Sequence, residues 1–126
     1  MADDTRLEPR NRLAGLADFP LPDSAPAQAL QQDSALLGRL LAGAAHGDGA
    51  GERAVSDEDV AAALGLFEEM RTALDRMEAQ VVIEARRRGL EWREIARHQG
   101  MKSSQAASQR YQRLVTRLEE IRQGIR

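Results

Sequence analysis

Residues 90–114 read LEWREIARHQGMKSSQAASQRYQRL, and the rest of the chain is organised around this stretch. Its apolar spacing predicts a short helix over residues 91–99. Trp92, Ile95 and Ala96 would share the inner face of that helix. The stretch therefore opens with a short amphipathic helix whose apolar side needs a partner.

A sharp turn and a second helix are predicted next. Gly100 follows the first helix, and a glycine at a helix end adopts a left-handed conformation without steric cost. Ser103 or Ser104 can cap the second helix by accepting a backbone N–H bond. The small side chains of Ala106 and Ala107 let two helices cross closely. This pattern predicts a helix-turn-helix over about residues 91–114.

The same stretch resembles a known motif. The pattern is Gly-x-x-Trp-x-x-Ile-Ala-x-x-x-Gly followed by Gln-Ala-Ala-x-x-Arg-aromatic, formed by Gly89, Trp92, Ile95, Ala96, Gly100, Gln105, Ala106, Ala107, Arg110 and Tyr111. It resembles the helix-turn-helix of small bacterial DNA-binding proteins and the region 4-like, promoter-reading helix-turn-helix of sigma factors. The resemblance implies an all-α fold that presents its second helix to DNA.

A long amphipathic helix is predicted to precede the motif. Ser56 offers a capping hydroxyl, and three carboxylates follow it where the helix dipole favours negative charge. Apolar residues then recur at spacings of three and four, at Val60, Leu64, Phe67, Met70, Leu74, Met77 and Val81. A helix running to Gly89 would be about 45–50 Å long. A helix of that length has more apolar surface than a compact three-helix unit can cover. The helix could break at Gly65, or its remaining apolar surface could pack against residues 34–45 or against another subunit.

The chain divides into two parts on composition. Residues 1–54 are predicted to form a flexible acidic arm, because all four prolines lie in it and no apolar period persists over residues 1–32. Residues 55–126 are predicted to form an all-α helix-turn-helix domain with an extended C-terminal helix.

The arm holds one candidate helix at residues 34–45. Ser34 can cap it, and one face carries Leu36, Leu37, Leu40 and Leu41. Residues 42–51 then have the composition of a flexible linker. The leucine face can fold back on its own chain or dock on another molecule, and the sequence leaves both open.

A heptad stripe continues past the motif to the end of the chain. Its members are Ala107, Tyr111, Leu114, Leu118, Ile121 and Ile125. The stripe is typical of a dimerising coiled coil, which would carry two recognition helices. It is equally typical of a helix that packs on the long helix of the same chain, and a short heptad pattern does not separate the two.

The charge of the chain is strongly asymmetric although its net value is only −2. Residues 1–59 carry 11 acidic and 5 basic side chains, whereas residues 85–126 carry 4 acidic and 11 basic ones. A basic end of this kind is typical of a surface that faces nucleic acid.

Candidate DNA contacts follow from the motif. Cations that neutralise phosphates would position the protein, and we assign this role to Arg93, Arg97, Lys102, Arg110 and Arg113. Polar side chains at the start of the second helix would read base edges, and we assign this role to Ser103, Ser104, Gln105, Ser108 and Gln109. The alternative for the serines and glutamines is ordinary solvated surface. Trp92 and Tyr111 are expected in the core and not as stacking platforms for bases.

Several function classes lack support. The chain has no cysteine, and its two histidines lie in the linker and the motif helix, away from any carboxylate set with metal-ligand spacing. We therefore expect no enzyme, no metal and no cofactor. No apolar run approaches the roughly 20 residues of a membrane span, and the acidic N-terminus is unlike a signal peptide. Arginine outnumbers lysine 17 to 1, which is typical of GC-rich bacterial genomes, so a bacterial cytoplasmic, nucleoid-associated protein is expected.

Two functions from different classes fit these observations. The first is a dimeric DNA-binding transcriptional regulator that uses the helix-turn-helix, with a possible protein partner for the N-terminal arm. The second is an all-helical interaction module that binds a sigma factor or another regulator, because a shared fold does not establish DNA binding. A weakly specific nucleoid-associated DNA binder lies between them.

Overall fold

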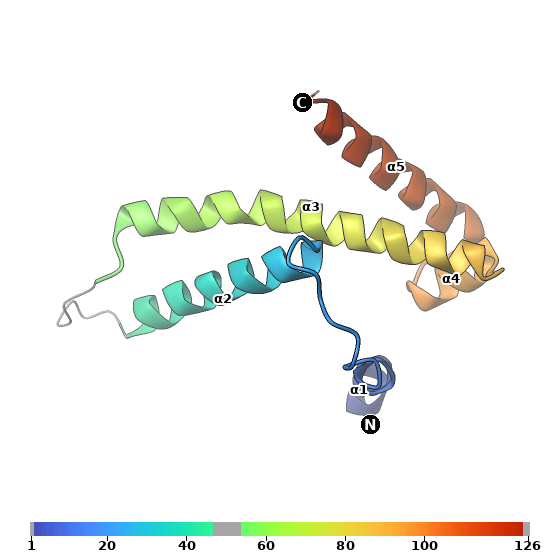
Figure 1. Cartoon of the computed structure of the whole chain (residues 1–126), viewed down its shortest axis with the longest axis horizontal. Coiled ribbons are helices and arrows are strands. Elements are labelled where there is room, and N and C mark those ends of the chain that lie inside the picture. The colour runs from blue at the N-terminus through green and yellow to red at the C-terminus, as the bar shows by residue number, and fades with distance from the viewer. Residues whose placement is uncertain (1, 47–53, 125–126) are drawn as a thin grey trace.

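The computed structural model describes residues 2–46 and 54–124, which form helices and connections with no strand (Figure 1). The helices are α1 (Ala2–Ala14), α2 (Pro26–Ala45), α3 (Asp57–Arg87), α4 (Trp92–His98) and α5 (Ser104–Gln123). The all-α class predicted from the sequence is confirmed. Within these ranges no helix combines the length and apolar character needed to cross a membrane.

Helix α3 is the spine of the molecule, and the other helices are arranged along it (Figure 1). Helix α2 runs back along the N-terminal half of α3 as an antiparallel partner, while α4 and α5 pack at its C-terminal end. Helix α1 contacts no other described helix. The second surface that the length of α3 calls for is thus supplied in part by α2, and α3 continues through Gly65 without a break.

The ends of α3 are set by the predicted residues. The Ser56 hydroxyl accepts a bond from the Asp59 amide (3.1 Å), and the Ser56 amide donates to the Asp59 carboxylate (3.0 Å). This reciprocal pair satisfies two amides that the first turn leaves without a helical partner. At the other end Gly89 takes a left-handed φ of 93°, and the Leu90 amide reaches back to the Ala85 carbonyl (3.0 Å).

The N-terminal region is more helical than predicted. Helix α1 covers part of the segment expected to be irregular, and α2 begins at Pro26, eight residues before Ser34. Pro26 stands in the first turn, where its missing N–H costs nothing, and the alanine-rich sequence after it favours helix. Ser34 therefore lies inside α2 and is not its cap. The predicted linker is helical as far as Ala45, and its members at 47–51 lie outside the described residues.

The tightest core lies where α3, α4 and α5 meet. Its buried members are Val82, Ile95, Ala96 and Ala107. Around them pack the half-buried Ala85, Leu90, Trp92, Met101 and Tyr111. Because Ala96 and Ala107 are small, α4 and α5 approach closely, and the side chain of Ala107 is only 1% exposed. This core fixes the position of α5 relative to α3.

The heptad stripe on α5 packs within the chain. Ala107 and Leu114 are buried, and Tyr111, Leu118 and Ile121 are half-buried, while α5 contacts α3 along this side. Near the C-terminal end of α5, Ile121 borders a pocket that Ala29 of α2 and Ala73 of α3 also line. Ile125, the last member of the stripe, lies outside the described residues. Of the two interpretations, packing on α3 of the same chain is the arrangement observed.

Candidate nucleic-acid interface

The connection between α4 and α5 is a sharp turn built on Gly100. This residue has a φ of 72°, in the left-handed region. The Met101 amide donates to the Ala96 carbonyl (2.8 Å), and the Gly100 amide donates to the Arg97 carbonyl (3.2 Å). These two bonds close the end of α4 in a Schellman motif and turn Met101 into the core. The turn leads directly into the start of α5.

Ser103 is the residue that caps α5. Its hydroxyl accepts a bond from the Ala106 amide (3.0 Å), which decides between the two serines considered as caps. One acceptor position of this hydroxyl is therefore committed to the helix. Ser103 can still donate a bond outward, but its role as a base-reading residue is the weakest of the five predicted positions.

The predicted base-reading residues lie on the outer side of α5, away from the core. Ser104, Gln105 and Gln109 are exposed, and Ser108 is half-buried. Further along the same side, Gln109, Gln112, Arg113 and Thr116 border one shallow groove. The spacing from Gln105 through Gln109 and Gln112 to Thr116 is the helical repeat that extends this face, and it could have indicated Thr116 in advance.

Four of the five cations predicted to contact phosphate are available at the surface. Arg93, Arg97, Lys102 and Arg113 are exposed, and none makes a hydrogen bond or ion pair with another residue in the described ranges. They come from α4, from the turn and from α5. A polyanion could therefore bind them without first displacing a carboxylate of this chain.

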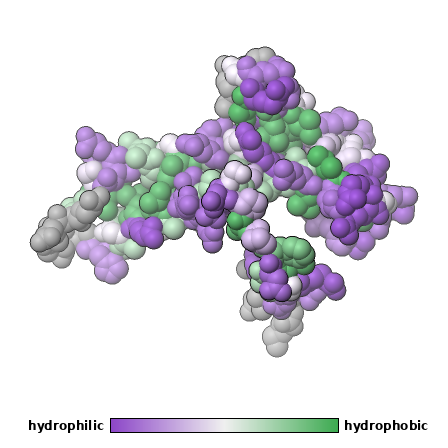
Figure 2. All heavy atoms as spheres, viewed as in Figure 1, coloured by the Kyte–Doolittle hydropathy of each residue, from purple (hydrophilic) through white to green (hydrophobic). Residues whose placement is uncertain are grey.

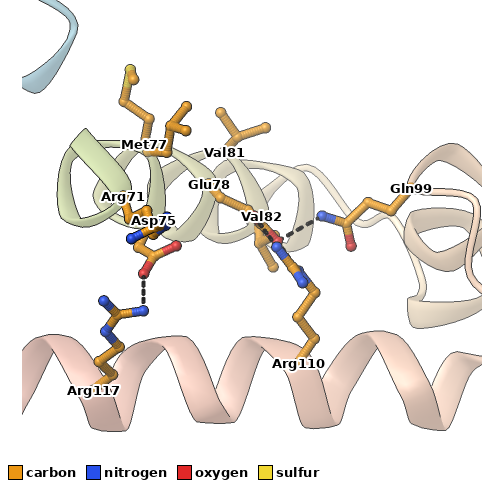
Figure 3. A pocket seen from close by; sticks show the side chains of 10 residues that line it. Arg71, Asp75, Met77, Glu78, Val81, Val82, Gln99, Arg110 and Arg117 are labelled. Atoms are coloured by element: carbon orange, nitrogen blue, oxygen red, sulfur yellow. Dashed lines mark hydrogen bonds and ion pairs between the residues drawn. The ribbon is translucent and has the colours of Figure 1, made fainter. Parts of the chain in front are cut away.

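Arg110, the fifth predicted cation, has a different environment. Its Nη2 donates to Glu78 of α3 (2.8 Å), and the Gln99 amide nitrogen donates to the same carboxylate (3.0 Å; Figure 3). The hydrogen bond from Arg110 lowers the pKa of the Glu78 carboxyl below its usual range. In the free protein Arg110 is thus bound to α3, an arrangement that sequence spacing does not indicate.

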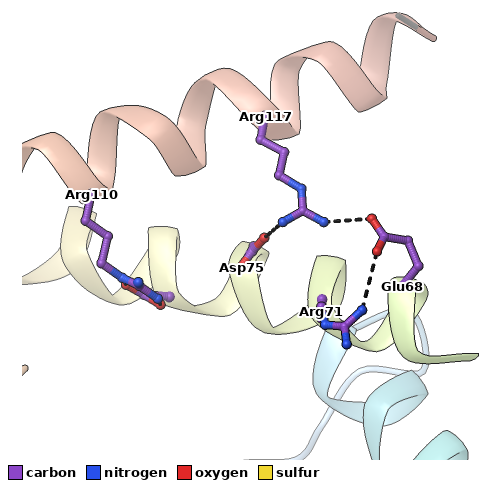
Figure 4. Close-up of polar contacts among 6 residues, drawn as sticks. Glu68, Arg71, Asp75, Arg110 and Arg117 are labelled. Carbon is purple, nitrogen blue, oxygen red and sulfur yellow. Dashed lines mark hydrogen bonds and ion pairs between the residues drawn. The ribbon is translucent and has the colours of Figure 1, made fainter. Parts of the chain in front are cut away.

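A second arginine, one heptad further along α5, repeats this arrangement. Arg117 donates to Glu68 (2.8 Å) and lies 3.1 Å from the Asp75 carboxylate (Figure 4). Arg71 of α3 also lies near Glu68, at 3.6 Å (Figure 4). Together the two α5 arginines tie this helix to three carboxylates of α3. The two arginines on the inner side of α5 are therefore paired with carboxylates of α3, whereas Arg113 on the outer side has no partner among the described residues.

The arginines at the end of α3 serve local structure. Arg87 and Arg88 both pair with Glu84, and their hydrogen bonds lower the pKa of this carboxyl to about 2. Arg86 donates to the Leu90 carbonyl (3.0 Å) and lies over the Trp92 ring, 5.1 Å from its centroid. These contacts stabilise the entry into α4, so the three residues are not a free basic patch.

The two aromatic residues of the motif belong to the core, as predicted. The rings of Trp92 and Tyr111 are 5.8 Å apart and tilted by 44°, and both residues pack on the buried cluster. Neither projects as a platform on which a base could stack.

This end of the molecule is strongly hydrophilic on its outside, as the space-filling view shows around α4 (Figure 2). Within the described ranges no group of three or more His, Asp or Glu side chains is placed to hold a metal ion. The site offers an outer face of α5 that carries hydroxyls, amides and Arg113, together with exposed cations on α4 and in the turn. Such a face can donate and accept hydrogen bonds and attract an anion.

No family model, no curated protein and no solved structure matches this chain.

Proposed function

We propose that the protein is a DNA-binding regulator that places the outer face of α5 in the major groove and acts as a dimer. The observation that supports this most strongly is a set of four cations on α4, the turn and α5 that are exposed and unpaired among the described residues: Arg93, Arg97, Lys102 and Arg113. Cations of this kind supply the salt-dependent part of DNA affinity, because each releases condensed counterions when it meets a phosphate.

The polar residues at the start of α5 would read sequence. Gln105 and Gln109 project from the first turns of α5, where a recognition helix meets base edges. A glutamine amide can both donate to and accept from adenine in the major groove. Ser104 and Ser108 can bond several base edges and add less selectivity.

Arg110 has a conditional role in this proposal. To contact a phosphate it would have to exchange its bonds to Glu78 for bonds to DNA. We therefore assign it to the scaffold of the free protein and rank it below the other four cations as a contact.

The interaction module remains a second candidate on the strength of one feature. An apolar pocket lies between α2 and α3, with Leu36, Leu40, Val55 and Leu66 among its lining residues. A pocket of this kind suits an apolar side chain from a partner protein such as a sigma factor. A nucleoid-associated protein with weak sequence preference would use the same cations as the regulator and fewer base contacts.

Mobility shift of the full chain on DNA fragments across a salt series tests the proposal. Each lost phosphate contact is expected to lower the slope of log affinity against log salt by about 0.9. The double variant Lys102→Ala, Arg113→Ala should therefore bind at least about tenfold more weakly at low salt and show a flatter slope. The matched control is Arg76→Ala, because Arg76 is exposed and unpaired among the described residues but lies on α3.

Two results would contradict the proposal. One is the absence of any shift at low salt. The other is a loss of binding free energy in Arg76→Ala that is half the loss in the double variant, because an equal loss for each removed charge would mean that only net charge matters. Replacing Gln105 and Gln109 with alanine separates the regulator from the nucleoid protein, because only a sequence-reading protein would lose its preference among fragments.

A further inference from the structure

Helix α3 presents an apolar stripe that the other described helices leave largely exposed, although the Arg71 guanidinium lies 5.9 Å from the centroid of the Phe67 ring. Its members are Val60, Leu64, Phe67, Leu74 and Val81, with exposures of 45%, 67%, 41%, 52% and 66%. In the close view Val81 points away from α5 together with its neighbour Met77 (Figure 3). The stripe therefore extends over most of the length of α3. It lies on a side of α3 that differs from the sides on which α2 and α5 pack.

The spacing of the stripe fits a helix-to-helix contact. Val60, Phe67, Leu74 and Val81 stand seven residues apart, which is the repeat of a left-handed coiled coil. A row this long on a monomer is unusual, because soluble proteins seldom expose extended apolar surface. Since the heptad stripe of α5 packs on α3 within the chain, the stripe on α3 is a helix face still open to another molecule, apart from the pocket between α2 and α3.

The charges of α3 indicate what that molecule is. Residues 57–70 contain five carboxylates and no cation, whereas residues 71–88 contain five arginines and three carboxylates. Two parallel copies of α3 would bring the acidic halves together, which is repulsive. Two antiparallel copies would set each acidic half against a basic half, and their helix dipoles would also oppose favourably.

We propose that α3 pairs with α3 of a second copy of this chain, antiparallel, with Val60 opposite Val81 and Phe67 opposite Leu74. The pairing deepens the dimeric part of the proposed function and rests on it, whereas DNA binding by each protomer is a separate property. In this register the two Arg87 positions lie about 50 Å apart, at 1.5 Å per residue. The two helix-turn-helix ends would then contact DNA sites separated by more than one helical turn, which is about 34 Å.

The mass of the full chain in solution tests the pairing without DNA. The wild type should have about twice the 13.9 kDa of one chain at micromolar concentration. Leu74→Glu and Val81→Glu should each weaken association by about a hundredfold or more, because each buries a charge in both protomers. The control is Ile83→Glu, since Ile83 is 51% exposed on α3 but lies off the stripe. It should remain dimeric.

A wild-type mass of one chain, or unchanged dimers in both stripe variants, would overturn the inference. The variants change exposed positions, so circular dichroism should show their helices intact. If the dimer forms and DNA does not bind, the proposed DNA binding fails and the interface stands. If the wild type is a monomer and still binds DNA, the proposed interface fails and the proposed DNA binding stands.

Disulfide capture tests the orientation, because the chain has no cysteine of its own. Two Cα atoms must lie within about 7 Å to be bridged. Val81→Cys alone should not cross-link, since antiparallel copies place these positions about 30 Å apart. Oxidation of a mixture of Val60→Cys and Val81→Cys chains should give a mixed disulfide. Ready cross-linking of Val81→Cys with itself would show parallel pairing and overturn the proposed orientation.

Discussion

The two ends of α3 carry similar apolar patterns and are packed very differently. At the C-terminal end Val82 is buried against Ile95, Ala96 and Ala107. At the N-terminal end α2 covers α3 with a row of leucines, yet no residue of α2 is buried. Alanines let helices approach until little space remains, whereas leucines on a single helix pair stay half in water. Apolar spacing thus predicts which side of a helix packs, and the size of the partner side chains decides how tightly.

The largest effect should come from a charge at the tight end. Ala107→Glu places a carboxylate in a crossing where the side chain is 1% exposed. The expected loss is about 3 kcal/mol or more in free energy of unfolding, because the charge is buried without a partner. Thermal unfolding followed by circular dichroism measures it, with the exposed Ala61→Glu on α3 as control. Equal melting temperatures for the two variants would mean that the crossing is not the tight end.

A smaller effect is expected where α2 packs. Leu40 is half-buried against α3, and its neighbour Leu41 is 67% exposed. Leu40→Ala should cost about 1–2 kcal/mol, less than the range for a fully buried leucine, and Leu41→Ala less than about 0.5 kcal/mol. Urea unfolding of both variants gives the difference. If Leu40→Ala cost as much as Ala107→Glu, the contrast between the two ends would disappear.

The smallest effect concerns the ion pair that fastens α5 to α3. Since Arg110 lowers the pKa of Glu78, the folded protein favours the ionised carboxylate. This stability is present above the usual glutamate pKa of 4.5 and is lost as the pH falls through the lower folded value. For a partly exposed pair it is worth about 0.5–1 kcal/mol. The wild type should therefore have a higher melting temperature than Glu78→Gln at pH 7, and this difference in melting temperature should disappear in acid. A difference that does not change with pH would show that packing, and not the ion pair, causes it.

The sequence predicted correctly those helix ends and turns that depend on hydrogen bonds between residues close in sequence. Ser56 begins α3, Gly89 ends it, and Gly100 turns the chain between α4 and α5, each through bonds to residues a few positions away. The start of α2 at Pro26 differs from the predicted start at Ser34, because the prolines of this region suggest irregular structure on composition alone. Proline in a first turn is compatible with helix, so composition was a poor guide there.

The state of individual charges could not be predicted in the same way. Arg110 and Arg113 are three residues apart and the motif predicts a phosphate contact for both, yet of the two only Arg110 is paired with a described residue. Its partner Glu78 lies 32 residues away in sequence, and no local rule connects the two. The exposure of Val81 could not be predicted either, because periodicity shows that a helix has an apolar side but does not show how much of that side other helices cover.

On α5 the residues that pack in the core and the exposed polar residues lie on opposite sides of the helix, so substitutions on one side should have little effect on the other. Gln105, Gln109 and Gln112 are exposed and contribute nothing to the buried cluster, which is formed from the opposite side of the helix. Exchanging them should leave the fold and its stability nearly untouched. Substitutions at these outer positions could therefore change the binding preference one residue at a time. The buried Ala96 and Ala107 would meanwhile keep the position of α5 relative to α4 constant.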